Sequence, residues 1–106
     1  FTVSSSWPLS RISQWRAMLA SRAIENQAFV VASNRVGKDK IATWGGTSII
    51  ASPHGEILGA GNETETQIIS SGIDPKIARS WRDEFPVLKD VQEDLIGKIT
   101  VRQVTA

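Results

Sequence analysis

The sequence has no cysteine and only one histidine, His54. Without cysteine, these residues hold no disulfide, no thiolate metal ligand and no cysteine nucleophile. A single imidazole excludes metal centres built on several histidines. A serine–histidine pair is also disfavoured, because no Gly-x-Ser-x-Gly segment presents a nucleophile and His54 lies in a Pro-His-Gly turn, which normally faces water. The residues alone therefore give no self-sufficient catalytic site and no metal site.

The sequence also lacks an excess of charge of either sign and any long apolar run. Twelve lysines and arginines oppose eleven acidic residues, for a formal net charge of +1, whereas nucleic-acid binding needs clustered basic side chains. No run approaches the ~20 apolar residues of a membrane span, and no signal peptide is visible. We therefore expect a cytoplasmic protein with neither nucleic acid nor membrane as partner. Its 106 residues form one domain at most, or a piece of one.

The clearest pattern in the chain is a helix that runs almost directly into a strand. Apolar residues recur at helical spacing between residues 9 and 27, and a short run rich in strand formers follows over residues 28–33. So tight a junction predicts a helix and a strand that pack as one layered unit. The apolar helix positions are Ile12, Trp15, Leu19 and Ala23, flanked by Met18 and Ile24.

Strands and further helices are expected on both sides of this unit, which predicts an α/β fold. The opening residues 1–6 read as a strand without capping or leader residues, which indicates a chain cut from a longer protein. Paired glycines at 45 and 46 predict a bulge or a close backbone approach inside a strand, and Asp74-Pro75 predicts a helix start. The expected strands are 1–6, 28–33, 41–52, 56–60, 67–73 and 98–104; a charged turn is expected at 37–40, a type I turn at 52–55 and a second helix from 74 to 85.

Two segments near the first helix could form part of a ligand site. Ser6-Trp7-Pro8 ends the first predicted strand, where α/β sheets place their ligand crevices, so Trp7 and Pro8 could form a rigid apolar wall. Trp7 could equally cap the core. Arg11 could clamp a carboxylate with its guanidinium fork, or could be a solvated surface arginine.

Other polar and apolar candidates also have two interpretations. Glu25 could act as a general base, but a carboxylate that holds Arg22, Arg35 or backbone amides explains it as well, and Asn26 reads as a junction-locking amide. Gly45, Gly46 and Ser48 could shape a pocket wall or only a bulge. The stripe formed by Ile77, Trp81 and Phe85 could face the core or an interface.

Several of these motifs, in this order, resemble one family. "SSSWPLSRISQWRAMLA", "RAIENQAFVVASNRVG" and "WGGTSIIASPHGEIL" resemble the C-terminal half of the nitrilase, or carbon–nitrogen hydrolase, superfamily, and within it the omega-amidase-like branch. The resemblance extends over about residues 1–94. It implies an αββα sandwich, of which this chain would be the C-terminal part. It also implies hydrolysis of a small amide by a glutamate, a lysine and a cysteine through a thioester, with no cofactor.

The resemblance implies that all three catalytic residues lie upstream of this chain, which would then be inactive alone. Supporting residues carry over instead: Ser6, Trp7, Pro8 and Arg11 as pocket wall, and Arg22, Glu25, Asn26, Asn34, Arg35, Gly45 and Ser48 as structural signature. Gln14 departs from the histidine that is common in this branch, which leaves the amide substrate open.

The resemblance also implies the partners of the chain. These are the upstream half of the same domain and a second subunit, the latter bound through the 9–27 helix and the 87–106 tail. The alternative is a non-catalytic interaction or structural module that retains half of a hydrolase fold. A stand-alone enzyme that uses serine or a carboxylate has little support.

Overall fold

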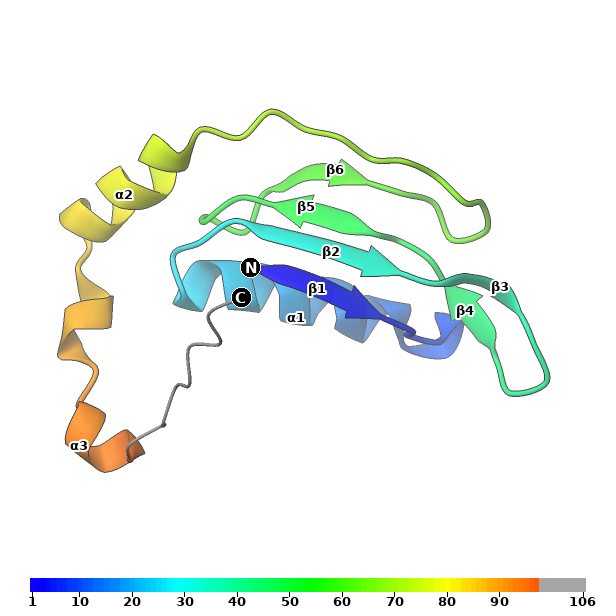
Figure 1. Ribbon diagram of the computed structural model, residues 1–106, viewed down its shortest axis with the longest axis horizontal. Coiled ribbons are helices and arrows are strands. Elements are labelled where there is room, and N and C mark those ends of the chain that lie inside the picture. The colour runs from blue at the N-terminus through cyan, green and yellow to red at the C-terminus, as the bar shows by residue number, and fades with distance from the viewer. Residues whose placement is uncertain (98–106) are drawn as a thin grey trace, which may run out of the picture.

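The computed structural model describes residues 1–97 and has two layers, a sheet with one long helix on one face (Figure 1). Helix α1 (Ile12–Glu25) connects two parallel strands and covers one face of the sheet. A second helix, α2 (Pro75–Glu84), lies away from the sheet. The strands are β1 (Thr2–Ser5), β2 (Val30–Asn34), β3 (Val36–Lys38), β4 (Thr43–Gly45), β5 (Ile49–Ala51) and β6 (Ile57–Ala60); the short helices are η1 (Leu9–Arg11), η2 (Val87–Asp90) and α3 (Glu93–Ile96). The predicted α/β class is confirmed.

The main sheet has the order β1-β2-β5-β6. Strand β1 pairs with β2 in parallel, with Thr2 opposite Val31, and the remaining two pairs are antiparallel. A parallel pair needs a crossover connection, and α1 supplies it. The predicted helix-to-strand unit is therefore the β1–α1–β2 part of this sheet.

The core lies between α1 and the sheet. Trp15, Leu19 and Ala23, spaced four residues apart, are buried on one side of α1, because this spacing keeps them on one helix face. They pack against Val30, Ala32, Ile49 and Ala51 of β2 and β5. The predicted stripe of Ile12, Trp15, Leu19 and Ala23 is confirmed, but the flanking Met18 and Ile24 are exposed. The first turn of the predicted helix, Leu9–Arg11, is a 3₁₀ helix rather than part of α1.

Helix α1 ends in a Schellman motif, which delays the start of the next strand. Ala28 N–H donates to Ala23 O at 3.0 Å, and Gln27 N–H donates to Ile24 O at 3.1 Å. These two bonds define the motif, and its left-handed position belongs to Gln27, with φ of +46°. Because the reversal takes up residues 26–29, the strand begins at Val30 and not at the predicted residue 28.

The predicted strand over 41–52 is interrupted at its glycines, as expected, but its two parts belong to different sheets. Of the two interpretations of the glycines, the close backbone approach is confirmed and the bulge is wrong. The chain divides there: β4 pairs with β3 in a separate two-stranded sheet, while β5 joins the main sheet. Gly46 and Thr47, with φ of +50° and +55°, make the turn between the two sheets. A β-carbon on Gly46 would lie 2.5 Å from Asn62 O, so only glycine fits here. The residues expected as a charged turn at 37–40 are the end of β3 and the start of its hairpin turn.

The segment after β6 also differs from the prediction. Residues 67–73 form no strand; the segment runs back along β6 without joining the sheet (Figure 1). The Ser52–Gly55 turn and the strand after it are confirmed, with Gly55 N–H donating to Ser52 O. Helix α2 begins as predicted, since the Asp74 carboxylate caps Lys76 N–H at 2.9 Å. The strand expected at 98–104 lies outside the described residues.

Candidate functional site

The predicted wall segment, Ser6-Trp7-Pro8, is held through the backbone of Trp7. Trp7 N–H donates to Asn34 Oδ1 at 2.6 Å, and Trp7 O accepts from Asn34 Nδ2 at 3.3 Å and from Gly45 N–H at 3.0 Å. The segment leaves β1, and Asn34 ends the neighbouring parallel strand β2. A side chain that both donates and accepts is needed here, and a carboxamide does both.

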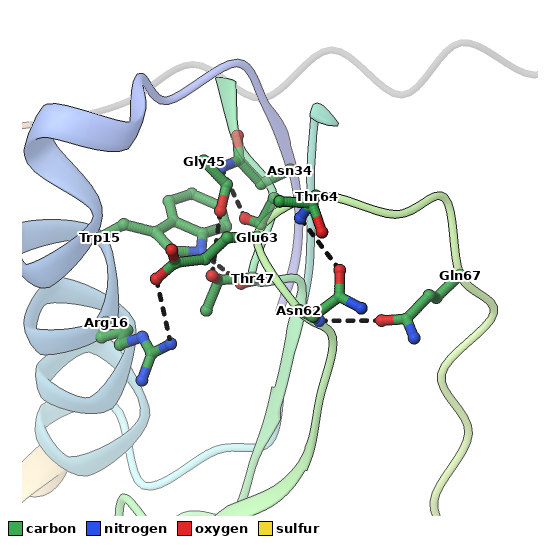
Figure 2. Close-up of polar contacts among 10 residues, drawn as sticks. Trp15, Arg16, Asn34, Gly45, Thr47, Asn62, Glu63, Thr64 and Gln67 are labelled. Atoms are coloured by element: carbon green, nitrogen blue, oxygen red, sulfur yellow. Dashed lines mark hydrogen bonds and ion pairs between the residues drawn. The ribbon is translucent and has the colours of Figure 1, made fainter. Parts of the chain in front are cut away.

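The same asparagine also fixes the corner formed by residues 45–48, where the chain passes from one sheet to the other. Asn34 Nδ2 donates to Gly46 O at 2.7 Å, and Asn34 N–H donates to Ser48 Oγ at 3.0 Å. Figure 2 shows Asn34, Gly45 and Thr47 close to the Trp15 indole, whose Nε1–H donates to Thr47 O at 2.8 Å. Three predicted signature residues, Asn34, Gly45 and Ser48, are therefore brought together with Trp7.

The loop after β6 closes over this corner from the other side. Thr47 N–H donates to Asn62 O at 2.9 Å. The Asn62 side chain accepts from Thr64 N–H, and Asn62 N–H donates to Gln67 Oε1 at 2.8 Å (Figure 2). The corner is thus held by backbone and carboxamide groups from three separate segments.

The Trp7 side chain packs on the core. Its ring lies 5.9 Å from that of Trp15, at 43° between the planes. It also lines an apolar hollow of about 350 Å³ between β1 and α1. Most of the lining is apolar: Phe1, Val3, Trp7, Trp15, Met18, Leu19 and Val30.

The other two predicted positions of the wall segment, Ser6 and Pro8, and the predicted Arg11 are outside this lining. Pro8 pairs with Trp44 of β4 through an isolated bridge. Arg11 is exposed at the end of η1, and its backbone N–H donates to Pro8 O at 3.0 Å. Trp7 therefore packs on Trp15, whereas Pro8 pairs with Trp44, and Arg11 lies at the surface one turn further along the chain.

A compact hairpin supports the wall segment through Trp44. The Asp39 carboxylate accepts from Ile41 and Ala42 N–H, from Trp44 Nε1–H at 3.0 Å, and pairs with Arg35 at 2.9 Å. The backbone hydrogen bonds from Ala42 and Ile41, and then the Trp44 indole, lower the pKa of Asp39 to about 2. The Arg35 guanidinium also lies 4.9 Å from the centre of the Trp44 ring. The predicted Arg35 thus acts within the β3–β4 hairpin.

The remaining signature residues lie at the other end of α1. Glu25 forms an ion pair with Arg22, and Asn26 Nδ2 donates to Arg22 O at 3.0 Å. A 14-residue helix is about 20 Å long, so this group lies at the opposite end of α1 from Trp7, although Arg22 and Asn26 line the same hollow as Trp7. The signature therefore forms two separate clusters, one at each end of the helix.

The sequence analysis missed Gln27, which joins α1 to α2. Its side chain is 1% exposed, and Nε2 donates to Phe85 O at 2.7 Å and to Trp81 O at 3.3 Å, at the end of α2. In return, Arg82 donates to Gln27 O at 3.1 Å and to Asn26 O at 3.3 Å, at the end of α1. Gln27 Oε1 is buried and has no hydrogen-bond partner among residues 1–97. The available signal was a long polar residue directly before an apolar strand.

Two kinds of site are not found in residues 1–97. No three histidine, aspartate or glutamate side chains gather there in a way that could hold a metal ion. None of the helices in this part of the chain has the length and apolar character to cross a membrane.

Comparison with known proteins gives consistent matches. The profile of the carbon–nitrogen hydrolase family matches residues 4–83. The chain is 38% identical to the 2-oxoglutaramate amidase of Bacillus subtilis over 93 residues, which are 88% of this chain and 36% of that protein. It is 36% identical to the omega-amidase YafV of Escherichia coli over 90 residues, 84% of this chain and 35% of that protein.

Solved structures agree with these matches. A superfamily protein from Xanthomonas campestris, XC1258, superposes with a TM-score of 0.76 at 30% identity, covering 88% of this chain and 36% of that one. The NitFhit protein of C. elegans superposes with a TM-score of 0.75 at 28% identity, covering 89% and 24% respectively. The chain spans about a third of the length of the curated relatives that it matches.

Proposed function

Because the chain belongs to the carbon–nitrogen hydrolase family, we propose that it is the C-terminal portion of an amidase that acts on a small amide in the cytoplasm. The observation that carries this proposal is the match to a 2-oxoglutaramate amidase over 88% of the chain. A second relative of similar identity is named an omega-amidase. The substrate would therefore be an amide of the omega-amidase type.

The proposed nucleophile is a cysteine outside these 106 residues, since the sequence has none. A glutamate and a lysine upstream would complete the catalytic set. The thiolate attacks the amide carbonyl carbon, ammonia leaves as the thioester forms, and water releases the acid. This chain alone would then be inactive, and its partner would be the upstream part of the same domain.

The proposed contribution of this chain is a rigid side of the substrate pocket. The Trp7 backbone has three hydrogen bonds to Asn34 and Gly45, so the segment from Ser6 to Pro8 has little freedom. Arg11, one turn further, would bind a substrate carboxylate through its guanidinium group. Positioning of this kind contributes to catalysis by keeping the substrate close to the nucleophile.

The test is a chimera in which this chain replaces the 93 matched residues of the Bacillus subtilis amidase. We expect the chimera to release ammonia from 2-oxoglutaramate and the 106-residue chain alone to release none. Arg11→Ala should raise KM about tenfold or more with a smaller effect on kcat, because a charged contact to the substrate is lost. Trp7→Ala should lower kcat/KM. Arg16→Ala, which removes an exposed arginine of α1 outside the proposed pocket wall, is the matched control.

Two results would contradict the proposal. Hydrolysis by the 106-residue chain alone would show a nucleophile among its own residues. A folded chimera without activity would favour the alternative, a non-catalytic module that retains part of a hydrolase fold. Binding of a second copy through the 9–27 helix and the 87–106 tail is a separate proposal, which the molar mass of the chimera in solution tests.

A further inference from the structure

We propose that Asp39 is a positioning residue for the amidase reaction, because its carboxylate holds the β3–β4 hairpin against the turn of helix that carries Arg11. This inference rests on the proposed function, in which Arg11 binds the carboxylate of the substrate. Asp39 acts through the backbone of β4 and η1 rather than by contact with the substrate. The inference is carried by the different partners of the two Asp39 oxygens and by the close approach of β4 to η1.

The two carboxylate oxygens of Asp39 have different partners. Oδ1 accepts from the backbone N–H groups of Ile41 and Ala42 at 2.8 and 3.0 Å, which closes the turn of the hairpin. Oδ2 accepts from Trp44 Nε1–H at 3.0 Å and pairs with Arg35 Nη1 at 2.9 Å. The first oxygen therefore forms the turn, and the second orients two side chains whose own backbones contact neighbouring segments.

The backbone around Trp44 holds the wall segment. Trp44 pairs with Pro8 through the isolated antiparallel bridge. The next residue, Gly45, donates its N–H to Trp7 O at 3.0 Å. Figure 1 shows the hairpin at the end of the sheet where β1 and β2 also end. The orientation of the Trp44 side chain therefore bears directly on the backbone position of the wall segment.

The backbone of Arg35 holds the end of β1 and the corner. Arg35 N–H donates to Ser5 O at 3.2 Å, and Arg35 O accepts from Gly46 N–H at 2.9 Å. Its guanidinium lies 4.9 Å from the centre of the Trp44 ring, so both groups that bond to Asp39 Oδ2 also lie against each other. This arrangement links the hairpin to the strand end on one side and to the wall segment on the other.

The closest approach of the hairpin is to η1, the helical turn that ends at Arg11. Gly45 is buried, and a β-carbon on it would lie 3.0 Å from Leu9 Cα and 2.8 Å from Ile12 Cδ1. Because Leu9 Cα is a backbone atom, it cannot turn aside as a side chain can. A displacement of β4 therefore displaces η1, and Arg11 moves with it.

The substitution Asp39→Asn isolates the role of Oδ2. A carboxamide keeps one acceptor oxygen for the turn but places an NH₂ donor opposite the donors of Trp44 and Arg35. It also removes one negative charge, which by itself would favour an anionic substrate and lower KM. Loss of positioning raises KM instead. The direction of the change therefore distinguishes positioning from a simple effect of charge.

The experiment uses the chimera with the Bacillus subtilis amidase and two substrates. One is 2-oxoglutaramate, which has a carboxylate, and the other is an aliphatic amide without one. Asp39→Asn should raise KM about fivefold or more for the first substrate and no more than about twofold for the second, with little change in kcat. Glu63→Gln, which removes the negative charge of the exposed Arg16–Glu63 pair, is the matched control and should change neither KM more than about twofold.

A double-mutant cycle tests whether Asp39 acts through Arg11. In the Arg11→Ala background, Asp39→Asn should change KM for 2-oxoglutaramate by no more than about twofold, because the group that it positions is gone. Effects that multiply independently would overturn the proposal. A lower KM in the single variant would also overturn it, since charge alone would then explain the result. An equal rise for both substrates would indicate a general loss of structure and would overturn it as well.

A second variant keeps the test decisive if Asp39→Asn does not fold. Trp44→Phe keeps an aromatic ring and the net charge but loses the indole N–H that bonds to Asp39 Oδ2. It should raise KM for 2-oxoglutaramate about threefold and leave KM for the uncharged amide within about twofold. An unchanged KM for 2-oxoglutaramate in the folded variant would contradict the role of Oδ2.

Hydrogen exchange separates this inference from the proposed function. In the chimera, Asp39→Asn should speed exchange of the Arg11 amide, which bonds to Pro8 O at 3.0 Å, about fivefold or more. The Val31 amide, which bonds to Phe1 O, should change little. A chimera that releases no ammonia but shows this pattern contradicts the amidase and keeps the link from Asp39 to η1. An active chimera in which neither exchange nor KM responds to Asp39→Asn keeps the amidase and contradicts the positioning role.

Discussion

The two ends of α1 are fixed by carboxamide side chains in different ways. Near its start, the Asn34 side chain bonds to backbone groups within the body of the protein, and each of its polar atoms has a partner. At its end, Gln27 bonds to carbonyls at the end of α2, which is distant in sequence, and its buried Oε1 has no partner in the part of the chain that the structure describes. The first arrangement closes the structure locally, whereas the second attaches the C-terminal arm, residues 75–96, to the body.

This difference indicates which substitutions should unfold the whole protein and which should affect only the arm. The arm buries no residue of its own in α2, η2 or α3. The described contacts that hold it are those of Gln27 and Arg82 and the packing of His54 on Trp81, 4.7 Å between ring centres. Changes around Asn34 should therefore unfold the protein, while changes around Gln27 should release the arm from a folded body.

Asn34→Ala should have the largest effect. It leaves Trp7 N–H, Trp7 O and Gly46 O with fewer partners in a partly buried corner. We expect the free energy of unfolding to fall by about 2–4 kcal/mol in urea denaturation, since each lost partner costs about 1–3 kcal/mol. Ser33→Ala, the exposed neighbour on β2, is the control and should change it little. A loss for Asn34→Ala as small as that of the control would show that the corner does not depend on this side chain.

Gln27→Ala should cost less, about 1–2 kcal/mol, and should act on the arm. It removes the side-chain amide that bonds to Phe85 O. It also leaves alanine, which disfavours positive φ, in the left-handed backbone conformation of residue 27. Gln27→Gly removes the same amide but relieves the left-handed backbone, so it should be about 1 kcal/mol more stable than Gln27→Ala. Limited proteolysis should cut both variants between residues 85 and 92 faster than the unsubstituted protein. Equal cutting in all three would contradict the role of Gln27.

Arg82→Met should have a smaller effect of the same kind. The substitution keeps an apolar stem but loses the hydrogen bonds to Gln27 O and Asn26 O at the end of α1, where a positive charge is also favourable. We expect about 0.5–1 kcal/mol, seen as faster hydrogen exchange in α2 with unchanged exchange in β2. Arg79→Met, on the same helix, is the matched control. Faster exchange in β2 would mean that the arm and the body unfold together.

The pH dependence of the β3–β4 hairpin should be the smallest effect. The pKa of Asp39 is lowered from 3.8 to about 2, so the ionised carboxylate stabilises the folded hairpin above the unfolded pKa. That contribution is lost as the pH falls from about 4 towards 2. The Trp44 indole N–H resonance should shift over this range, and Asp39→Asn should abolish the shift. A midpoint near 3.8 in the folded protein would contradict the hydrogen-bonded carboxylate.

The sequence predicted those parts of the fold that depend on local rules. The four-residue spacing of Trp15, Leu19 and Ala23 is a property of one helix, and Asp74 and Pro75 specify a helix start by their own chemistry. The division of 41–52 between two sheets could not be predicted in this way. It depends on Gly46 meeting Asn62 O, a contact between segments that only the folded chain brings together.

The candidate site shows the same limit. Trp7, Asn34, Gly45 and Ser48 were each identified from motifs, but their convergence on one corner depends on the parallel pairing of β1 with β2. Gln27 was missed because its partners lie more than fifty positions away, with sequence separations of 54 and 58. Residues 67–73 follow the same limit: their two adjacent isoleucines favour a strand, yet the segment runs beside β6 without joining the sheet.

The placement of the four tryptophans gives the protein its own set of optical reporters. Trp7 follows β1, Trp15 lies in the core at 2% exposure, Trp44 is in the small hairpin and Trp81 is on the arm. Variants that keep one indole at a time would therefore report separately, by emission wavelength and collisional quenching, on the strand end, the core, the hairpin and the arm. Sequential loss of structure could then be followed region by region without any attached dye.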